Sequence, residues 1–186
     1  MKILFTLVIF GAFITRLKSA RGVSSLPSGV ETPDITQFYT QNETIWTINT
    51  TIQFTEIICK VDLVNKTTAN YADFTRMYFW KGNLTSNYLR GTFTTIPTFT
   101  NKSVYNAMMV GPPDGFVTST EELVSVYANY TCGIFDVLGV EGFHSHYEVR
   151  VKNITFGHPD PECVRQFMNI SGHSYKTITN DSCLNT

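Results

Sequence analysis

Glu148 and Arg150 are the residues whose types and spacing most directly suggest a binding site. They stand two positions apart in the alternating segment 147–154, so both side chains should lie on one face of a β-strand. If that face lines a cavity, the two charges are costly to bury unless they are paired or bind a ligand. Two interpretations stay open: the groups neutralise each other, or Arg150 holds a ligand carboxylate or hydroxyl while Glu148 orients it.

No other residue pattern predicts catalysis, a metal site or a cofactor. The chain has no G-x-S-x-G, H-E-x-x-H or glycine-rich phosphate loop. His144 and His146 stand two positions apart, as two metal ligands on one face of a strand would. No acid or cysteine completes a metal site, so we interpret them as loop residues. Glu121 and Glu122 open a predicted strand, and we interpret them as an exposed, solvated pair. The sequence therefore predicts a protein that binds rather than catalyses.

The N-terminus and the cysteines predict a secreted protein. Residues 3–14 form an unbroken apolar run behind Lys2, and the small residues Ser19, Ala20 and Gly22 follow. The run is too short to span a bilayer and has the layout of a signal peptide, so we expect residues 1–22 to be removed and residues 23–186 to form the mature domain. An even number of cysteines behind a signal peptide predicts two disulfides, with three connectivities open. The cysteines are Cys59, Cys132, Cys163 and Cys183.

The mature chain carries few cations and many N-glycosylation sequons. The 186 residues include 14 Lys and Arg and 15 Asp and Glu, and removal of residues 1–22 leaves a net charge of −5. No basic cluster remains, so nucleic acid and anionic membranes are excluded as partners, and no membrane anchor is expected. Nine N-x-[ST] sequons predict a heavily glycosylated extracellular protein. Their asparagines are Asn42, Asn49, Asn65, Asn83, Asn101, Asn129, Asn153, Asn169 and Asn180.

The elements that must position these residues are short β-strands followed by one helix. Turn signals separate apolar or alternating stretches between Trp46 and Arg150, and about eight strands at this spacing predict an all-β barrel or sandwich. An apolar i, i+3, i+4 face in residues 163–170, preceded by prolines and acids and closed by Gly172, predicts a helix outside the barrel. Residues 23–41 form a polar lead-in. We expect strands at 45–51, 54–64, 74–80, 88–99, 104–110, 123–130, 131–140 and 147–154, and a short last strand near 175–179.

This arrangement resembles the lipocalins, and the C-terminal third resembles the salivary lipocalins of ticks, the family that includes the histamine-binding proteins. Residues 131–137 (TCGIFDV) are similar to that family's Cys-x-[Val/Ile]-[Phe/Tyr]-x-Val strand, and residues 147–150 (YEVR) stand where it often has Tyr-Glu-Leu-Trp. The spacing from Cys163 to Phe167 is similar to its Cys-x3-Phe helix. Upstream, residues 43–51 and 59–62 resemble a subgroup from hard ticks.

The resemblance implies the fold and the cysteine pairing. The fold would be an eight-stranded antiparallel lipocalin barrel with a C-terminal α-helix packed outside. The pairing would be Cys59 with Cys183, which fastens the tail to an early strand, and Cys132 with Cys163, which fastens the helix to the seventh strand. The protein would act as a secreted monomer.

Strand alternation predicts which side chains line the cavity, because a glycosylated asparagine must point outward. An outward Asn49 turns Trp46 and Ile48 inward, and an outward Asn153 turns His146, Glu148 and Arg150 inward. The resulting cavity is mostly apolar, with Glu148 and Arg150 as its charged pair. The predicted ligand-binding residues are Trp46, Ile48, Tyr78, Trp80, Phe93, Met109, Phe135, Val137, Glu148 and Arg150.

An apolar cavity in this family predicts a salivary protein that sequesters a sterol, fatty acid or eicosanoid and so modulates host immune and inflammatory responses. Histamine-binding relatives have an Asp where this chain has Gly133 and a Trp where it has Arg150, so the amine site looks dismantled. Two alternatives remain open. One is a histamine or serotonin scavenger. The other is a binder of a host protein, such as a complement component or a receptor, through an outer surface that includes Phe116 in the loop 111–120.

Overall fold

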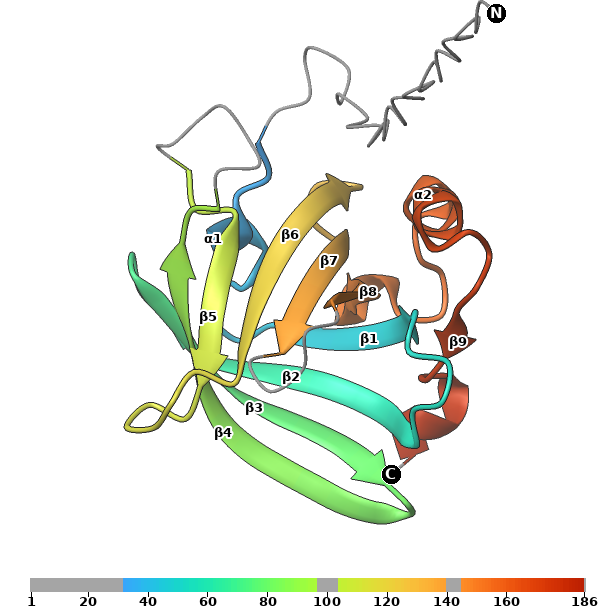
Figure 1. Ribbon diagram of the computed structural model, residues 1–186, viewed down its shortest axis with the longest axis horizontal. Coiled ribbons are helices and arrows are strands. Elements are labelled where there is room, and N and C mark those ends of the chain that lie inside the picture. The colour runs from blue at the N-terminus through green and yellow to red at the C-terminus, as the bar shows by residue number, and fades with distance from the viewer. Residues whose placement is uncertain (1–31, 97–103, 140–144, 186) are drawn as a thin grey trace, which may run out of the picture. The chain divides into compact units, whose positions relative to one another are not determined.

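Antiparallel strands and a C-terminal helix make up the structure, a computed structural model that describes residues 32–96, 104–139 and 145–185 (Figure 1). The predicted signal peptide, Asn101 and His144 lie outside these residues. The strands are β1 (Thr44–Thr50), β2 (Ile57–Thr67), β3 (Tyr71–Trp80), β4 (Asn83–Thr94), β5 (Ala107–Gly111), β6 (Ser119–Tyr127), β7 (Cys132–Gly139), β8 (Ser145–Lys152) and β9 (Lys176–Thr177). The helices are α1 (Ile35–Phe38) and α2 (Pro161–Ser171), with 3₁₀ turns η1 (Asn153–Thr155) and η2 (Asp181–Asn185).

Eight of the described strands close into a barrel. Each strand from β2 to β8 pairs antiparallel with the next, β8 pairs with β1, and β1 pairs back with β2 to complete the ring. β9 pairs with β1 outside that ring. The predicted eight-stranded antiparallel barrel is confirmed, with strand bounds that shift by a few residues.

The turn between β3 and β4 shows how local sequence sets the barrel's register. Lys81 and Gly82 have φ values of 52° and 78° and join two strands that pair from Trp80 and Asn83 onward. Two central residues with positive φ match the right-handed twist of a two-residue hairpin, and glycine adopts that conformation without a steric penalty. Lys81 and Gly82 are therefore one of the turn signals that separate the predicted strands.

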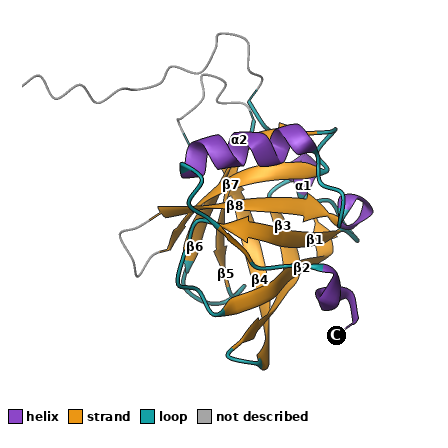
Figure 2. Cartoon of the chain, turned by 90° about the vertical axis from the view of Figure 1, so that its right-hand side faces the viewer, coloured by secondary structure: helices purple, strands orange, loops and turns teal. Residues whose placement is uncertain are grey.

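The helix α2 packs on the outside of the barrel, against β6, β7 and β8 (Figure 2). Asp160 caps it by accepting a hydrogen bond from the Cys163 amide, Pro161 occupies its first turn, and Gly172 ends it with a φ of 58°. Its buried side chains, Cys163 and Phe167, face the barrel wall. No helix in the described ranges is long and apolar enough to cross a membrane.

The short helix α1 closes one end of the barrel, where the sequence predicted only a polar lead-in. Asp34 caps it by accepting from the Thr36 amide, and Phe38 and Tyr39 follow as fully buried aromatic residues. Backbone hydrogen bonds to the β4–β5 and β6–β7 connections hold it in place, from Ile35 to the Tyr105 carbonyl and from Asp34 to the Tyr130 hydroxyl. The lead-in prediction was wrong because one turn of helix has almost no periodicity to detect.

Two hydrophobic cores lie on the two sides of the barrel wall, and both disulfides belong to the outer one. The pairing implied by the resemblance is confirmed, with Cys59 bonded to Cys183 and Cys132 bonded to Cys163. The inner core consists of residues such as Ile45, Phe74, Leu89, Phe93, Met108, Leu123, Phe135 and Val137, beneath α1. The outer core consists of Trp46, Val61, Ile134, Val149, Val151 and Phe167, with the cysteines.

Candidate functional site

Six of the ten predicted cavity residues face the inside of the barrel. Phe93, Phe135 and Val137 are buried in the inner core. Glu148 and Arg150 also point inward, where they are 3% and 0% exposed. Tyr78 lines a cavity at the end of the barrel opposite α1. The strand alternation inferred from Asn153 for β8 was therefore correct.

Trp46 and Ile48 face the outside of the barrel, so their predicted place in the cavity was wrong. A β-bulge in β1 between Thr47 and Asn49 places two successive residues on the outer side and reverses the alternation inferred from Asn49. Trp46 belongs to the outer core and lines a hollow of about 190 Å³ on the outer wall. Its indole Nε1 donates a hydrogen bond to Asn153 Oδ1 at 3.2 Å.

Met109 and Trp80 are also outside the cavity. Met108, not Met109, packs into the inner core, and a Cβ on Gly91 would lie 2.4 Å from its Sδ, so this glycine makes room for it. Met109 is 40% exposed on the other face of β5. From the sequence alone, either of the two adjacent methionines could point into the barrel. Trp80 is 51% exposed at the end of β3, on the rim of the open end.

Asn49 lies on the outer side of β1, but the C-terminal segment covers it. The residue is 7% exposed, and its Oδ1 accepts a hydrogen bond from the Thr177 hydroxyl at 2.9 Å. A glycan at Asn49 would displace that contact. The other sequon asparagines in the described ranges are exposed, namely Asn42, Asn65, Asn83, Asn129, Asn153, Asn169 and Asn180.

Glu148 binds two cations inside the barrel. Its carboxylate accepts hydrogen bonds from Lys60 Nζ at 2.6 and 2.9 Å and from Arg150 Nε and Nη2 at 2.9 and 2.6 Å. His146 Nε2 lies 3.3 Å from the same carboxylate. The side chains of Glu148 and Arg150 are 4% and 1% exposed. The pairing suggested by their spacing is present, but Lys60 from β2 takes part in it as well.

Glu121 joins Arg150 to a second arginine. It accepts hydrogen bonds from Arg150 Nη1 and from Arg76 Nη1 and Nη2, the last two at 2.8 and 3.2 Å. Arg76 also donates to Asp62 through Nε at 2.7 Å and Nη2 at 2.8 Å. The Tyr39 hydroxyl donates to Asp62 at 2.8 Å and accepts from Arg150 at 2.7 Å. Three cations and three carboxylates therefore alternate across the barrel in one network.

Two predictions were wrong: that Glu121 is exposed to solvent, and that the cavity is mostly apolar. Glu121 is 0% exposed, because its position in β6 shares the inward face with Leu123. One signal could have revealed part of the network: Lys60 and Asp62 flank Val61 just as Glu148 and Arg150 flank a valine in β8. The residues that the sequence analysis missed are Tyr39, Lys60, Asp62, Arg76 and Glu121.

The network fixes the charge state of its members. Burial alone raises the pKa of Glu121, but the charges of Arg150 and Arg76 outweigh it and hold that pKa well below its usual range. Burial likewise raises the pKa of Glu148, and Lys60 and Arg150 together bring it well below its ordinary value. Burial lowers the pKa of Lys60, and Glu148 offsets only part of that effect.

Acid should weaken the fold through these carboxylates. A carboxylate with a depressed folded-state pKa stabilises the fold fully above its unfolded pKa, about 4.3 for Glu, and the contribution is lost as the pH falls below that value. Because the pKa values of Glu121 and Glu148 are both depressed, we expect the contribution of each carboxylate to the free energy of unfolding to fall by about 1–2 kcal/mol between pH 7 and pH 3. Urea unfolding at pH 7, 5, 4 and 3 measures this. A free energy of unfolding that is constant from pH 7 to 3 would contradict it.

A cavity of about 380 Å³ opens at the end of the barrel opposite α1. A smaller hollow of about 130 Å³ adjoins it, and the two share Ile57 and Lys60 as lining residues. The larger one is lined by Ile57, Lys60, Arg76, Tyr78, Asn87, Leu89, Pro112 and Thr118. The smaller one adds Thr50, Ile52, Thr55, His146, Glu148 and Ile178. The charge network therefore forms the floor of the cavity.

Lys60 and Arg76 line the cavity, and each has an N–H group that the hydrogen bonds of the network do not use. An ammonium has three N–H donors, and two hydrogen bonds link Lys60 to Glu148. A guanidinium has five, and four link Arg76 to Asp62 and Glu121. Arg150 is fully buried and lines neither cavity, so it does not reach a ligand there. The cavity thus combines a partly apolar wall with a floor that donates hydrogen bonds.

A closed eight-stranded antiparallel barrel with a helical turn across one end and a C-terminal helix outside is the lipocalin fold. No protein-family model and no curated protein matches the chain. Solved structures do. AM182 in complex with serotonin superposes with a TM-score of 0.61 at 15% identity, over 86% of this chain and 97% of that one. Japanin from Rhipicephalus appendiculatus, bound to cholesterol, gives 0.54 at 11% identity, over 81% and 100%.

A third solved structure, of the siderocalin Ex-FABP, gives a TM-score of 0.55 at 4% identity, over 75% of this chain and 94% of that one. At such low identities the likeness establishes the fold and nothing finer. What these proteins have in common is a barrel that binds a small ligand, as their complexes with serotonin and cholesterol illustrate.

Proposed function

We propose that the protein is a secreted lipocalin that binds one small amphipathic ligand in the open-end cavity. The observation that carries the proposal is the unused donor capacity of Lys60 and Arg76 at the floor of a cavity whose wall also offers apolar side chains. The polar end of the ligand would accept hydrogen bonds from these two cations. Its apolar body would lie against Ile57, Tyr78 and Leu89.

The size and charge of the cavity favour a lipid with an acceptor head group. A volume of about 380 Å³ lies at the lower end of the range for ligand pockets, about 300–1,000 Å³. A fatty acid or an eicosanoid therefore suits it better than a sterol. A biogenic amine suits it less, because Lys60 and Arg76 would face the amine while Glu121 and Glu148 are already bound to cations.

The wider role follows from the resemblance to tick salivary lipocalins. Japanin, one of the structural neighbours, comes from a tick and was solved with cholesterol. We place the protein in the same setting, where sequestration of a lipid mediator in saliva would modulate the host response. The predicted signal peptide, the disulfides and the exposed sequons support secretion as a glycoprotein.

Replacing Lys60 by Met should weaken the binding of a fatty acid about 10- to 100-fold, the effect of losing one charge-assisted hydrogen bond. Isothermal titration with arachidonic acid, cholesterol and serotonin measures the affinities, and native mass spectrometry of the deglycosylated protein detects any ligand that co-purifies. Lys152→Met is a matched control, because Lys152 is a mostly buried lysine that bonds to the α1 region at the closed end. A wild-type protein that binds none of the three compounds would contradict the proposal, as would unchanged affinity in Lys60→Met.

A further inference from the structure

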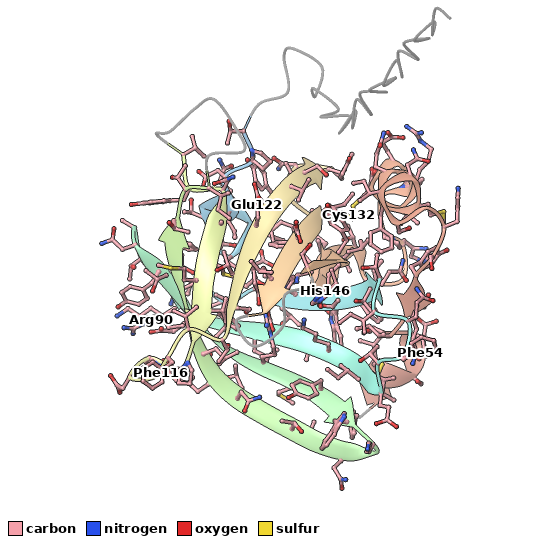
Figure 3. The ribbon with its side chains drawn as sticks, in the orientation of Figure 1. Phe54, Arg90, Phe116, Glu122, Cys132 and His146 are labelled. Atoms are coloured by element: carbon pink, nitrogen blue, oxygen red, sulfur yellow. A yellow bond between two sulfur atoms is a disulfide. The ribbon has the colours of Figure 1, made fainter. Side chains whose placement is uncertain are left out.

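Among the described residues, three aromatic side chains around the mouth of the cavity are exposed to solvent. Phe54 in the β1–β2 loop is 98% exposed, and Phe116 in the β5–β6 loop is 94% exposed. Trp80 at the end of β3 is 51% exposed. Figure 3 shows Phe54 and Phe116 on separate loops, to the right and the left of strands β2 to β4. Side chains of this size and exposure keep a large apolar area in contact with water, which is unfavourable until another surface covers them.

Each of these side chains is adjacent to residues that line the two open-end cavities. Ile52 and Thr55 flank Phe54 in the chain and line the smaller hollow. Pro112 and Thr118 lie on either side of the Phe116 turn and line the larger cavity. Trp80 pairs in register with Ile57, which lines both. A surface that covers the three aromatic residues would therefore also cover the entrance to the cavity.

The charges beside the three aromatic residues indicate the kind of surface. Glu56 and Lys81 pair with each other at 3.3 Å, and the Lys81 ammonium also lies 5.1 Å from the centre of the Trp80 ring. Asp114 adds one negative charge beside Phe116. The described residues at this end of the barrel carry no surplus of cations, so they lack the attraction to anionic lipid that a basic patch provides. Tryptophan and phenylalanine side chains nevertheless favour the interface of a bilayer.

We propose that this aromatic rim, formed by Phe54, Trp80 and Phe116, docks the open end of the barrel reversibly on a neutral, zwitterionic lipid surface. The three side chains enter the interface and the cavity mouth faces the acyl chains, which requires that the sequon at Asn83, paired in register with Trp80, carries no glycan. An amphipathic ligand then passes between membrane and cavity without crossing water. The docking requires only the aromatic rim. The transfer of a ligand between membrane and cavity rests in addition on the function proposed above.

Trp80 reports the docking directly, because the chain has only two tryptophans. Trp46 is 8% exposed and hydrogen-bonded on the outer wall, so a Trp46→Phe variant leaves Trp80 as the single reporter. Vesicles of phosphatidylcholine with brominated acyl chains should quench its fluorescence and shift the emission to the blue. Adding phosphatidylserine to the vesicles should not strengthen the effect.

The double variant Phe54→Ser/Phe116→Ser, made on the Trp46→Phe background, should lower the partition coefficient about tenfold or more, because two phenyl groups leave the interface. Ile154→Ser is the matched control: Ile154 is 84% exposed but lies in η1, after the closed-end terminus of β8. Absence of quenching by phosphatidylcholine vesicles would overturn the proposal, as would unchanged partition of the double variant or binding that requires anionic lipid. Titration of arachidonic acid without vesicles tests the cavity separately, and the rim variants should bind it like the wild type.

Discussion

Replacing Glu121 by Gln is expected to lower the free energy of unfolding by about 3–5 kcal/mol, the cost of leaving a buried charge without its partner. Glu121 is fully buried and bonds to both Arg76 and Arg150. Glutamine keeps the shape of the side chain but removes the charge that compensates two guanidinium groups. Since small domains are stable by about 5–15 kcal/mol, the loss should be large in equilibrium unfolding with urea.

The matched control is Glu162→Gln, which breaks another glutamate–arginine pair of the same protein. The side chains of Arg165 and Glu162 are 59% and 48% exposed, so water screens that pair and its loss should cost far less than the loss of Glu121. Equal losses for Glu121→Gln and Glu162→Gln would contradict a buried network.

A double variant tests whether charge balance is the cause. Glu121→Gln combined with Arg150→Met removes one charge of each sign and leaves two separate pairs, Lys60 with Glu148 and Arg76 with Asp62. Replacement of a buried pair by groups of similar volume is often nearly neutral. The double variant should therefore regain most of the stability that the single variant loses. A further loss would show that packing, not charge, dominates at this site.

The fold could be predicted because its signals are local. Proline and acids before residue 163 and Gly172 after the helix fix α2, and the Lys81-Gly82 turn fixes one hairpin. The cysteine pairing came from the resemblance, since spacing alone leaves three possibilities. The helix α1 was missed because its stability comes from packing across the barrel end, through Phe38 and Tyr39, rather than from a pattern in its own four residues.

The site was harder to predict, because it depends on register and on contacts between distant strands. One β-bulge in β1 moved Trp46 and Ile48 out of the cavity, whereas the unbroken alternation of β8 placed Glu148 and Arg150 correctly. Glu121 resembles a surface acid when its strand is considered alone. It is recognisable as buried only once the barrel brings Arg76 and Arg150 beside it, 45 and 29 positions away in the chain.

Removal of the Cys59–Cys183 disulfide, by replacing both cysteines with serine, is expected to cost about 2–5 kcal/mol of unfolding free energy. The bond spans 124 residues, against 31 for Cys132–Cys163. In the chain-entropy model this fourfold difference makes the longer link more stabilising by about 1 kcal/mol. Thermal and urea unfolding of the two double-serine variants measures both losses, and a larger loss for the shorter link would contradict the entropic account.

The two disulfides should also differ in their effect on ligand binding. Cys59 has a φ of 54°, which a residue other than glycine seldom adopts, and its amide donates to the Ile178 carbonyl at 2.7 Å. Its neighbour Lys60 and Ile178 itself line the smaller cavity. The Cys132–Cys163 bond instead ties α2 to the outer wall. Loss of the Cys59–Cys183 bond should therefore weaken fatty acid binding several-fold, while loss of the Cys132–Cys163 bond should leave the affinity of the folded protein unchanged. Equal effects on affinity would mean that the C-terminal segment does not hold the cavity floor.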